Sequence, residues 1–166
     1  MGVYEAIQPE ENREFTLGVG NWTGDITWDP GPIGGRSGLI KIDVDPFPAY
    51  GVGQLLYPYA KPIRNKYHNF GLYFFAPLGQ PGPYIKVTLT DGVYTFDRPW
   101  YYLDIYDTWI RVSHDVDIPS DWNIEETIVS FTVKNDALLD PMTTYADGAS
   151  FYAFTKVDHL PILGVG

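Results

Sequence analysis

The sequence predicts an all-β protein, built as a two-sheet antiparallel β-sandwich of eight or nine strands. Its 166 residues include 17 glycines and 14 prolines, and 16% of them are aromatic, a composition typical of turn-rich β proteins. Short segments alternate apolar and polar residues with a period of two, as half-buried strands do. Clusters of Gly, Pro and Asp separate these segments, and no stretch has a convincing helical period.

The predicted strands are recognised by this alternation. Residues 38–45 place Ile40, Ile42 and Val44 on one face, and residues 108–118 carry the longest regular pattern. The dipeptide Asp91-Gly92 predicts a hairpin turn. Further strands are expected at 67–76, 84–90, 93–96, 100–106, 127–134 and 150–157. The first of these is apolar on both faces, which predicts a central strand.

The opening strand and the loops follow from the positions of Gly and Pro. Residues 12–24 are predicted to form the opening strand, with Phe15 and Leu17 on one face and Trp22 turned inward. Loops are expected at 29–35, 46–66 and 135–148, and one helical turn at 122–126. A loop as long as 46–66 is usually functional or interfacial.

The chain is predicted to be one domain over residues 1–166, with an N-terminal arm at 1–11 and an apolar C-terminal tail at 160–166. The arm is expected to hydrogen-bond at a sheet edge or to a neighbouring molecule. An apolar tail is costly in water, so we expect it to lie in a groove on another copy of the chain. The tail residues predicted to mediate assembly are Leu160, Ile162, Leu163 and Val165.

Charge and composition exclude several classes of partner. Eleven basic and 21 acidic residues give a formal net charge of −10, which repels nucleic acid and anionic lipid. The chain has no Cys, which excludes disulfides, thiolate catalysis and Cys-based zinc sites. No apolar run approaches the length of a membrane span, and the first residues lack a signal-peptide pattern. We expect a virion or extracellular setting.

Aromatic residues next to acids are the strongest indication of a ligand. A sugar site needs a flat aromatic face and nearby carboxylates or amides. Such pairs occur at Trp28 with Asp29, at Tyr57 and Tyr59, at Trp122 with Asp121, and within residues 100–106. The predicted sugar platform is Trp100, Tyr102, Asp104 and Tyr106, the last three alternating on one strand face. The alternative is that these rings pack beneath loops or against a neighbouring subunit.

The sequence offers no convincing catalytic or metal-binding constellation. His114 falls on the inward face of a predicted strand, where a lone histidine is usually a hydrogen-bonded core residue. The pairs Asp43/Asp45 and Asp115/Asp117 resemble a glycosidase or calcium site, but solvated outer strand faces look the same and are favoured. Common nucleophile, metalloprotease and phosphate-binding motifs do not occur in the sequence. We therefore expect no catalytic residue, no metal and no cofactor.

Taken in order, these elements resemble the jelly-roll carbohydrate-binding modules of the galactose-binding-like superfamily. The matching pieces are residues 12–15 with 21–24, then 70–74, 108–112 leading to Ile118 and Pro119, and 151–157. They span most of the chain, and the resemblance implies a jelly-roll fold and glycan binding. That family's last strand usually carries two adjacent acids, which residues 154–157 lack. This departure counts against the structural calcium ion of those modules.

Two functions are compatible with these features. The favoured one is a non-catalytic structural or binding protein of a virion or extracellular assembly, of the phage capsid-decoration or tail type. Its partners would be other copies of itself, a capsid or tail protein, and surface glycans. The alternative is a carbohydrate-binding module excised from a secreted glycoside hydrolase. A free-standing enzyme is the least favoured hypothesis.

Overall fold

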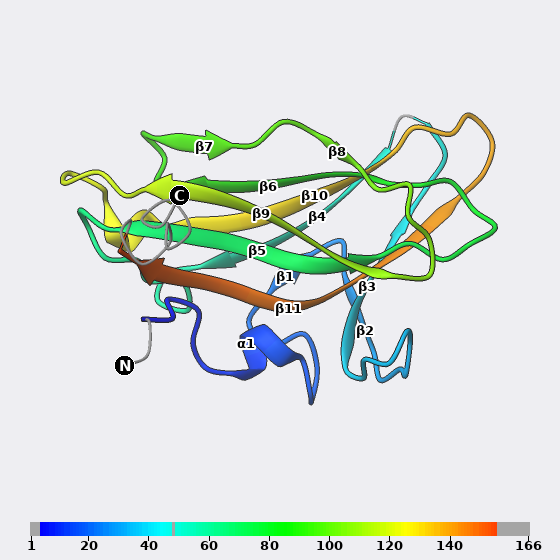
Figure 1. The fold of residues 1–166 in the computed structure, drawn as a ribbon, viewed down its shortest axis with the longest axis horizontal. Helices are drawn as coiled ribbons and strands as arrows, with labels where there is room; N and C mark the ends of the chain where they lie inside the picture. Colours follow the sequence, from blue (N-terminus) through cyan, green and yellow to red (C-terminus); the bar gives the residue numbers. More distant parts are fainter. Residues whose placement is uncertain (1–3, 48, 156–166) are drawn as a thin grey trace, which may run out of the picture.

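The structure is a computed structural model that describes residues 4–47 and 49–155, and it contains two antiparallel β-sheets packed face to face (Figure 1). The six-stranded sheet has the order β1 (Thr23–Gly24), β4 (Ala49–Leu56), β10 (Ile128–Asn135), β6 (Tyr84–Thr90) and β7 (Thr95–Asp97), and β8 (Tyr101–Tyr102) also pairs with β6. The five-stranded sheet has the order β2 (Thr27–Asp29), β3 (Leu39–Val44), β11 (Met142–Phe154), β5 (Tyr67–Phe75) and β9 (Trp109–Asp117). The predicted β-sandwich is confirmed.

The core lies between the sheets and is filled by the alternate residues of each strand. In β10, Val129, Phe131 and Val133 are fully buried, as their period of two predicts. The ring of Phe131 is 5.7 Å from that of Trp22 and 5.6 Å from that of Phe74. Full burial of each such side chain stabilises the fold by about 1.5–3 kcal/mol.

Of the opening strand predicted at residues 12–24, only Thr23–Gly24 (β1) is a strand, and the rest of the prediction is wrong. Residues Glu11–Glu14 form the short helix α1, and Phe15 ends it in a left-handed conformation with a φ of 53°. The chain turns there, so Phe15 is buried while Leu17 is 79% exposed. The cause is Asn12, whose buried amide accepts a hydrogen bond from the backbone N–H of Asn21 at 2.7 Å and folds the segment on itself. Trp22 points inward, as predicted.

Two predicted loops contain strands. β4 lies within 46–66, and β11 begins within 135–148. Neither strand shows a regular apolar alternation in the sequence. In β4 the inward positions Gly51 and Gly53 carry no apolar side chain, and in β11 a bulge between Asp147 and Ser150 interrupts the period of two. Residues 4–47 and 49–155 therefore contain eleven strand segments, where eight or nine strands were predicted. Conversely, the strand expected at 100–106 is confined to Tyr101–Tyr102.

The other predicted elements are close to those observed. β3, β5, β6, β7, β9 and β10 overlap the strands expected from alternation, and β5 is central as predicted. The helical turn expected at 122–126 is the 3-10 helix Ile124–Glu126. Within residues 4–47 and 49–155, no helix is long and apolar enough to cross a membrane.

The N-terminal arm pairs with the sheet, as expected. The backbone N–H of Ala6 donates to the carbonyl of Phe151, and that of Ala153 donates to the carbonyl of Tyr4, each at 2.8 Å. β3 pairs with β11 only as far as Ala146, so the arm occupies the adjoining length of β11. The apolar tail at 160–166, with Leu160, Ile162, Leu163 and Val165, lies outside the described residues.

Candidate functional site

The outer face of the five-stranded sheet carries a cleft whose floor is set by strand register. Gly71 of β5 pairs with Ser113 of β9 on one side and with Ser150 of β11 on the other. These three residues form a row of small side chains across the middle of three neighbouring strands. The rows on either side carry larger side chains, and Ser113 and Ser150 of the small row each line one of two hollows on this face.

The flanking rows supply rings and polar groups. On one side the register aligns Asp115, Asn69 and Tyr152, and on the other it aligns Arg111, Tyr73 and Asp147. The cleft has two limbs that share Arg111 and Tyr152, with volumes of about 690 and 440 Å³. Both lie within the size range of small-molecule sites.

The two limbs are defined by their linings. The first limb is lined by Asn69, Arg98, Pro99, Arg111, Ser113, His114, Asp115 and Tyr152. The second limb is lined by Arg13, Glu14, Arg36, Tyr73, Arg111, Gly148, Ala149, Ser150 and Tyr152. Residues of α1, of the loop after β2 and of three strands therefore meet on one face.

Asn69 organises the first limb. Its side-chain oxygen accepts a hydrogen bond from Arg111 Nη2 at 2.5 Å, and its Nδ2 donates to Asp115 Oδ1 at 2.7 Å and to Ser113 Oγ at 3.2 Å. The amide is almost fully buried, so the strand below fixes its position. It therefore holds a cationic and an anionic planar group in defined orientations on the cleft wall.

The segment before β8 closes the other side of the first limb. Arg98 Nη1 donates to the backbone carbonyl of Ser113 at 2.7 Å, on the free edge of β9. His114 is half-buried beside it, and its pKa is lowered by burial and then by the positive charge of Arg98. The prediction that His114 is a core residue is wrong, because β9 is an edge strand and its inner face is only partly covered at this point.

Arg36 shapes the second limb. Its guanidinium carbon lies 4.3 Å from the centre of the Tyr73 ring, and its Nη1 pairs with Asp147 Oδ2 at 3.2 Å. Burial raises the pKa of Asp147, even though Arg36 opposes the shift. The bulge at Gly148, with a φ of 60°, brings this carboxylate beneath the arginine. The ion pair thus fixes the ring and the guanidinium as one wall.

The cleft combines partly exposed aromatic rings with planar hydrogen-bonding groups, and the Arg36 guanidinium lies over the Tyr73 ring. Tyr73 and Tyr152 are partly exposed, and Asn69, Arg111 and Asp115 present amide, guanidinium and carboxylate groups beside them. Ring faces suit the apolar side of a pyranose, and the planar groups suit its hydroxyls. Within residues 4–47 and 49–155, no three His, Cys, Asp or Glu side chains are grouped to hold a metal ion.

The structure brings only part of the predicted sugar platform together. Tyr102 and Tyr106 line a pocket of about 300 Å³ at one end of the sandwich. A hydrogen bond with Tyr106 raises the pKa of Tyr102, and the Tyr102 ring lies 4.8 Å from that of Tyr84. Trp100 does not line the pocket but lies near it on the outer face of the six-stranded sheet, 6.3 Å from the ring of Tyr50 and 5.7 Å from Lys134 Nζ, which is 5.6 Å from the Tyr84 ring. Asp104 is exposed and does not line this pocket.

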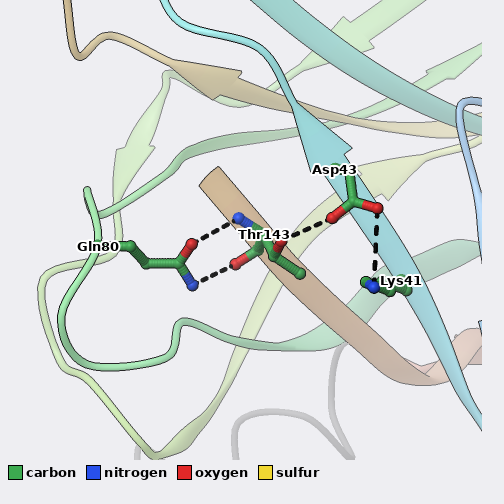
Figure 2. A network of polar contacts seen from close by, with 4 residues as sticks. All are labelled: Lys41, Asp43, Gln80 and Thr143. Carbon is green, nitrogen blue, oxygen red and sulfur yellow. Dashed lines mark hydrogen bonds and ion pairs between the residues drawn. The ribbon is translucent and has the colours of Figure 1, made fainter. Parts of the chain in front are cut away.

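The wall of this pocket is anchored by Gln80 (Figure 2). Its side-chain oxygen accepts from the backbone N–H of Thr143 at 2.7 Å, and its Nε2 donates to the carbonyl of Thr143 at 2.9 Å. β5 ends at Phe75, opposite Tyr145, so the Gln80 amide takes the next position along the β11 edge. The hydroxyl of Thr143 donates to Asp43, which pairs with Lys41.

The structure also places the other aromatic and acidic residues that the sequence singled out. Trp122 is fully buried, as the alternative of packing beneath a loop predicts, and its Nε1 donates to Thr127 Oγ1 at 2.8 Å. Trp28 is 40% exposed, as expected. The members of the pairs Asp43/Asp45 and Asp115/Asp117 are all exposed, but Asp115 is hydrogen-bonded to Asn69 within the cleft.

Sequence reasoning missed most of the cleft. The outward residues of 67–76 and 108–118 were visible as alternating faces, but only the acid pairs on them drew attention. Arg98 and Tyr152 join the cleft through pairings far apart in the sequence, such as Tyr152 with Asn69. A search for planar polar side chains at outward positions of neighbouring strands would have found Asn69 and Arg111.

Comparison with known proteins gives structural relatives but no sequence family. No family model matches the chain, and no curated protein matches its sequence. A family 61 carbohydrate-binding module in complex with β-1,4-galactotriose aligns with a TM-score of 0.60 and 13% identity over 92% of this chain and 99% of that one. The C-terminal family 22 module of Clostridium thermocellum Xyn10B aligns with a TM-score of 0.60 and 13% identity over 90% and 92% of the two chains.

A phage protein contains a similar fold. The enzymatically active domain of bacteriophage CBA120 tailspike protein 4 aligns with a TM-score of 0.60 and 8% identity, over 90% of this chain and 21% of that one. At such low identities the likeness shows the fold alone. The chain therefore has the β-sandwich fold found in carbohydrate-binding modules.

Proposed function

We propose that this chain is a non-catalytic protein that binds a saccharide chain in the cleft on the outer face of the five-stranded sheet. The observation that carries the proposal is the cleft itself, where Tyr73 and Tyr152 flank the row of small residues at Gly71 beside the Asn69–Arg111–Asp115 network. The fold shared with modules that are named for binding xylan or galactotriose supports it.

The arrangement suits a chain rather than a single sugar. The small row runs across the strands and the two limbs are continuous through Arg111 and Tyr152, so a ligand of several sugar units has room along the cleft. Tyr152 lies where the limbs meet, and a pyranose stacked there is within reach of the Asn69 amide in the neighbouring strand. The polar groups are already fixed by mutual hydrogen bonds, which lowers the cost of ordering them on binding.

The proposed setting is a virion or extracellular assembly of the capsid-decoration or tail type, with copies of this chain or a capsid or tail protein as partners. The likeness to part of a tailspike chain supports this setting, and the likeness to modules of xylanases supports the alternative of a module from a glycoside hydrolase. Isolation of the intact protein from its source distinguishes them, because the first predicts recovery with particles and the second recovery joined to a catalytic domain.

A glycan array with matched variants tests the binding site. Wild type is expected to bind, Tyr152→Ala to lose binding, and Tyr102→Ala, in the pocket at the end of the sandwich, to retain it. Circular dichroism checks that each variant is folded. Loss with Tyr102→Ala but not with Tyr152→Ala would move the site to the predicted sugar platform. Failure of the folded wild type to bind any glycan would refute the proposal.

A separate experiment tests the proposal that the protein is non-catalytic. Polysaccharides bound on the array are incubated with the protein, and new reducing ends are measured over time. No release is expected. Sustained release of sugar by pure wild-type protein would contradict this part while leaving the binding site in place.

A further inference from the structure

Arginine is distributed unevenly over this acidic protein. The chain carries a net charge of −10 and only five arginines. Four of them, Arg13, Arg36, Arg98 and Arg111, line the two limbs of the cleft. The face that offers the best sugar site is therefore also the place where guanidinium groups gather.

The acids around the cleft are largely committed to protein groups. Asp147 is buried and paired with Arg36. Asp115 accepts a hydrogen bond from Asn69. Glu5 accepts hydrogen bonds from the backbone N–H groups of Ile7 and Phe151. Burial raises the pKa of Glu5, although the positive charges of Arg13 and Arg111 oppose the shift.

The first limb is lined by two guanidinium groups, those of Arg98 and Arg111, and by one carboxylate, that of Asp115. Arg36 is matched by Asp147 in the second limb, and Arg13 stands beside Glu14 there. Counting the shared Arg111 in both limbs, each limb has one more guanidinium than carboxylate, and the first limb also holds half-buried His114, a further cationic group when it is protonated.

Arg98 has hydrogen-bonding capacity that the described residues do not use. Its Nη1 donates to Ser113, but its Nε is enclosed and has no hydrogen-bond partner within residues 4–47 and 49–155. An unsatisfied N–H on a charged group is costly. Arg111 lies two residues from Ser113 on the same strand face, about 7 Å along the strand. Both arginines thus line the first limb, Arg98 at Ser113 and Arg111 at Asn69, which is itself hydrogen-bonded to Ser113.

We propose that the first limb recognises an acidic sugar, a uronic acid residue of the bound saccharide, through its carboxylate. The carboxylate lies between Arg98 and Arg111, and the sugar ring lies against Tyr152. Guanidinium is suited to this task because its planar donors match the two oxygens of a carboxylate. The proposal rests on the proposed function and adds the substrate class.

The test compares acidic polysaccharides with neutral forms of the same chains. Polygalacturonate and alginate are each measured beside their carboxyl-reduced counterparts, which keep the linkages and replace each carboxylate by a hydroxymethyl group. We expect the wild-type protein to bind at least one acidic form about tenfold or more tightly than its reduced form, because charge-assisted hydrogen bonds are lost on reduction. Dextran sulfate is included as a competitor to detect general attraction to polyanions.

Substitutions of the two arginines test whether they recognise the carboxylate. Arg98→Gln and Arg111→Gln are each expected to remove the preference for the acidic form while some binding to the reduced form remains. Lys61→Gln is the matched control, because Lys61 is exposed, lies outside both limbs and carries the same charge. Melting curves show whether each variant is folded. If one arginine variant fails to fold, the other variant and the comparison of acidic with reduced ligands on the wild-type protein still test the proposal.

The possible results separate the two proposals. Equal binding of acidic and reduced forms, or competition by dextran sulfate as strong as that by the acidic chains, overturns recognition of a uronic acid and leaves carbohydrate binding intact. A preference that survives in both arginine variants also overturns it. If neither form of these chains nor any glycan on the array binds the folded protein, both proposals fall.

Discussion

His68 shows how a single residue is set by its surroundings. It is fully buried with its ring 5.0 Å from that of Phe151, its Nε2 accepts the backbone N–H of Ile63, and its Nδ1 faces the carbonyl of Lys66 at 3.1 Å. This pattern fits a neutral ring that donates from Nδ1. Burial lowers the pKa of His68 to about 4. His68, rather than His114, is therefore a buried core histidine.

This histidine predicts a dependence of stability on pH. In the unfolded chain its pKa is near 6.5, so between pH 6.5 and 4 the unfolded state binds a proton that the folded state does not. The free energy of unfolding should therefore fall as the pH is lowered through this window, and His68 should contribute about 3 kcal/mol to the loss. Urea unfolding at a series of pH values measures it.

The control is His68→Gln, which removes the titrating ring. The stability lead of wild type over this variant should be constant above pH 6.5 and shrink toward pH 4. His114→Gln, at the half-buried histidine, should change the pH profile less. If the lead of wild type over His68→Gln does not change with pH, the folded protein does not keep this ring neutral.

At the scale of elements, alternation predicted a strand only where its inward positions carry side chains. β4 was not predicted because Gly53 faces inward, and the Phe131 ring packs where a side chain at Gly53 would lie. β11 escaped because its bulge shifts the period by extra residues. The strand at 100–106 was overpredicted because its aromatic residues fit a strand pattern, but only Tyr101 and Tyr102 find a partner strand, β6.

Gln80 yields a prediction at this scale (Figure 2). Gln80→Leu removes both hydrogen bonds to the backbone of Thr143, where no strand can replace them because β5 has ended. We expect a loss of about 1–3 kcal/mol in unfolding free energy, from two hydrogen bonds whose backbone partners become unpaired. Urea unfolding measures the loss, and hydrogen exchange should show faster exchange of the Thr143 amide.

Gln54→Leu, on the outer face of β4, is the matched control and should change stability little. A Gln80→Leu variant as stable as wild type, with a protected Thr143 amide, would show that the loop after β5 is held by other contacts.

At the scale of the whole molecule, the two sheets leave two different outer faces. The five-stranded sheet bears the cleft and most of the arginines, and the six-stranded sheet bears Trp100 and Tyr50 with Lys86 4.6 Å from the Trp100 ring. The N-terminal arm and α1 lie along β11 beside the cleft, and Arg13 and Glu14 of α1 line its second limb (Figure 1). The cleft is thus completed by Arg13 and Glu14, residues that the sequence analysis assigned to an opening strand.

The tail predicts self-association, and this remains a prediction because residues 160–166 lie outside the described residues. Deletion of 160–166 should abolish concentration-dependent oligomers in analytical ultracentrifugation, since burial of its apolar residues is the expected driving force. The melting temperature at low protein concentration should hardly change. Oligomers that persist after the deletion, or a wild type that is monomeric at all concentrations, would exclude this role of the tail.

The sequence by itself determined the fold class, most strand faces and the charge of the protein, because side chains alternate along a strand whatever its neighbours are. Tertiary structure alone decided the cleft. Its rows, such as Ser113, Gly71 and Ser150, run across strands, and their alignment depends on pairing between residues up to 83 positions apart, as for Asn69 and Tyr152. Register is fixed by the packed core and by the bulge in β11, neither of which is written in the local pattern of any one strand.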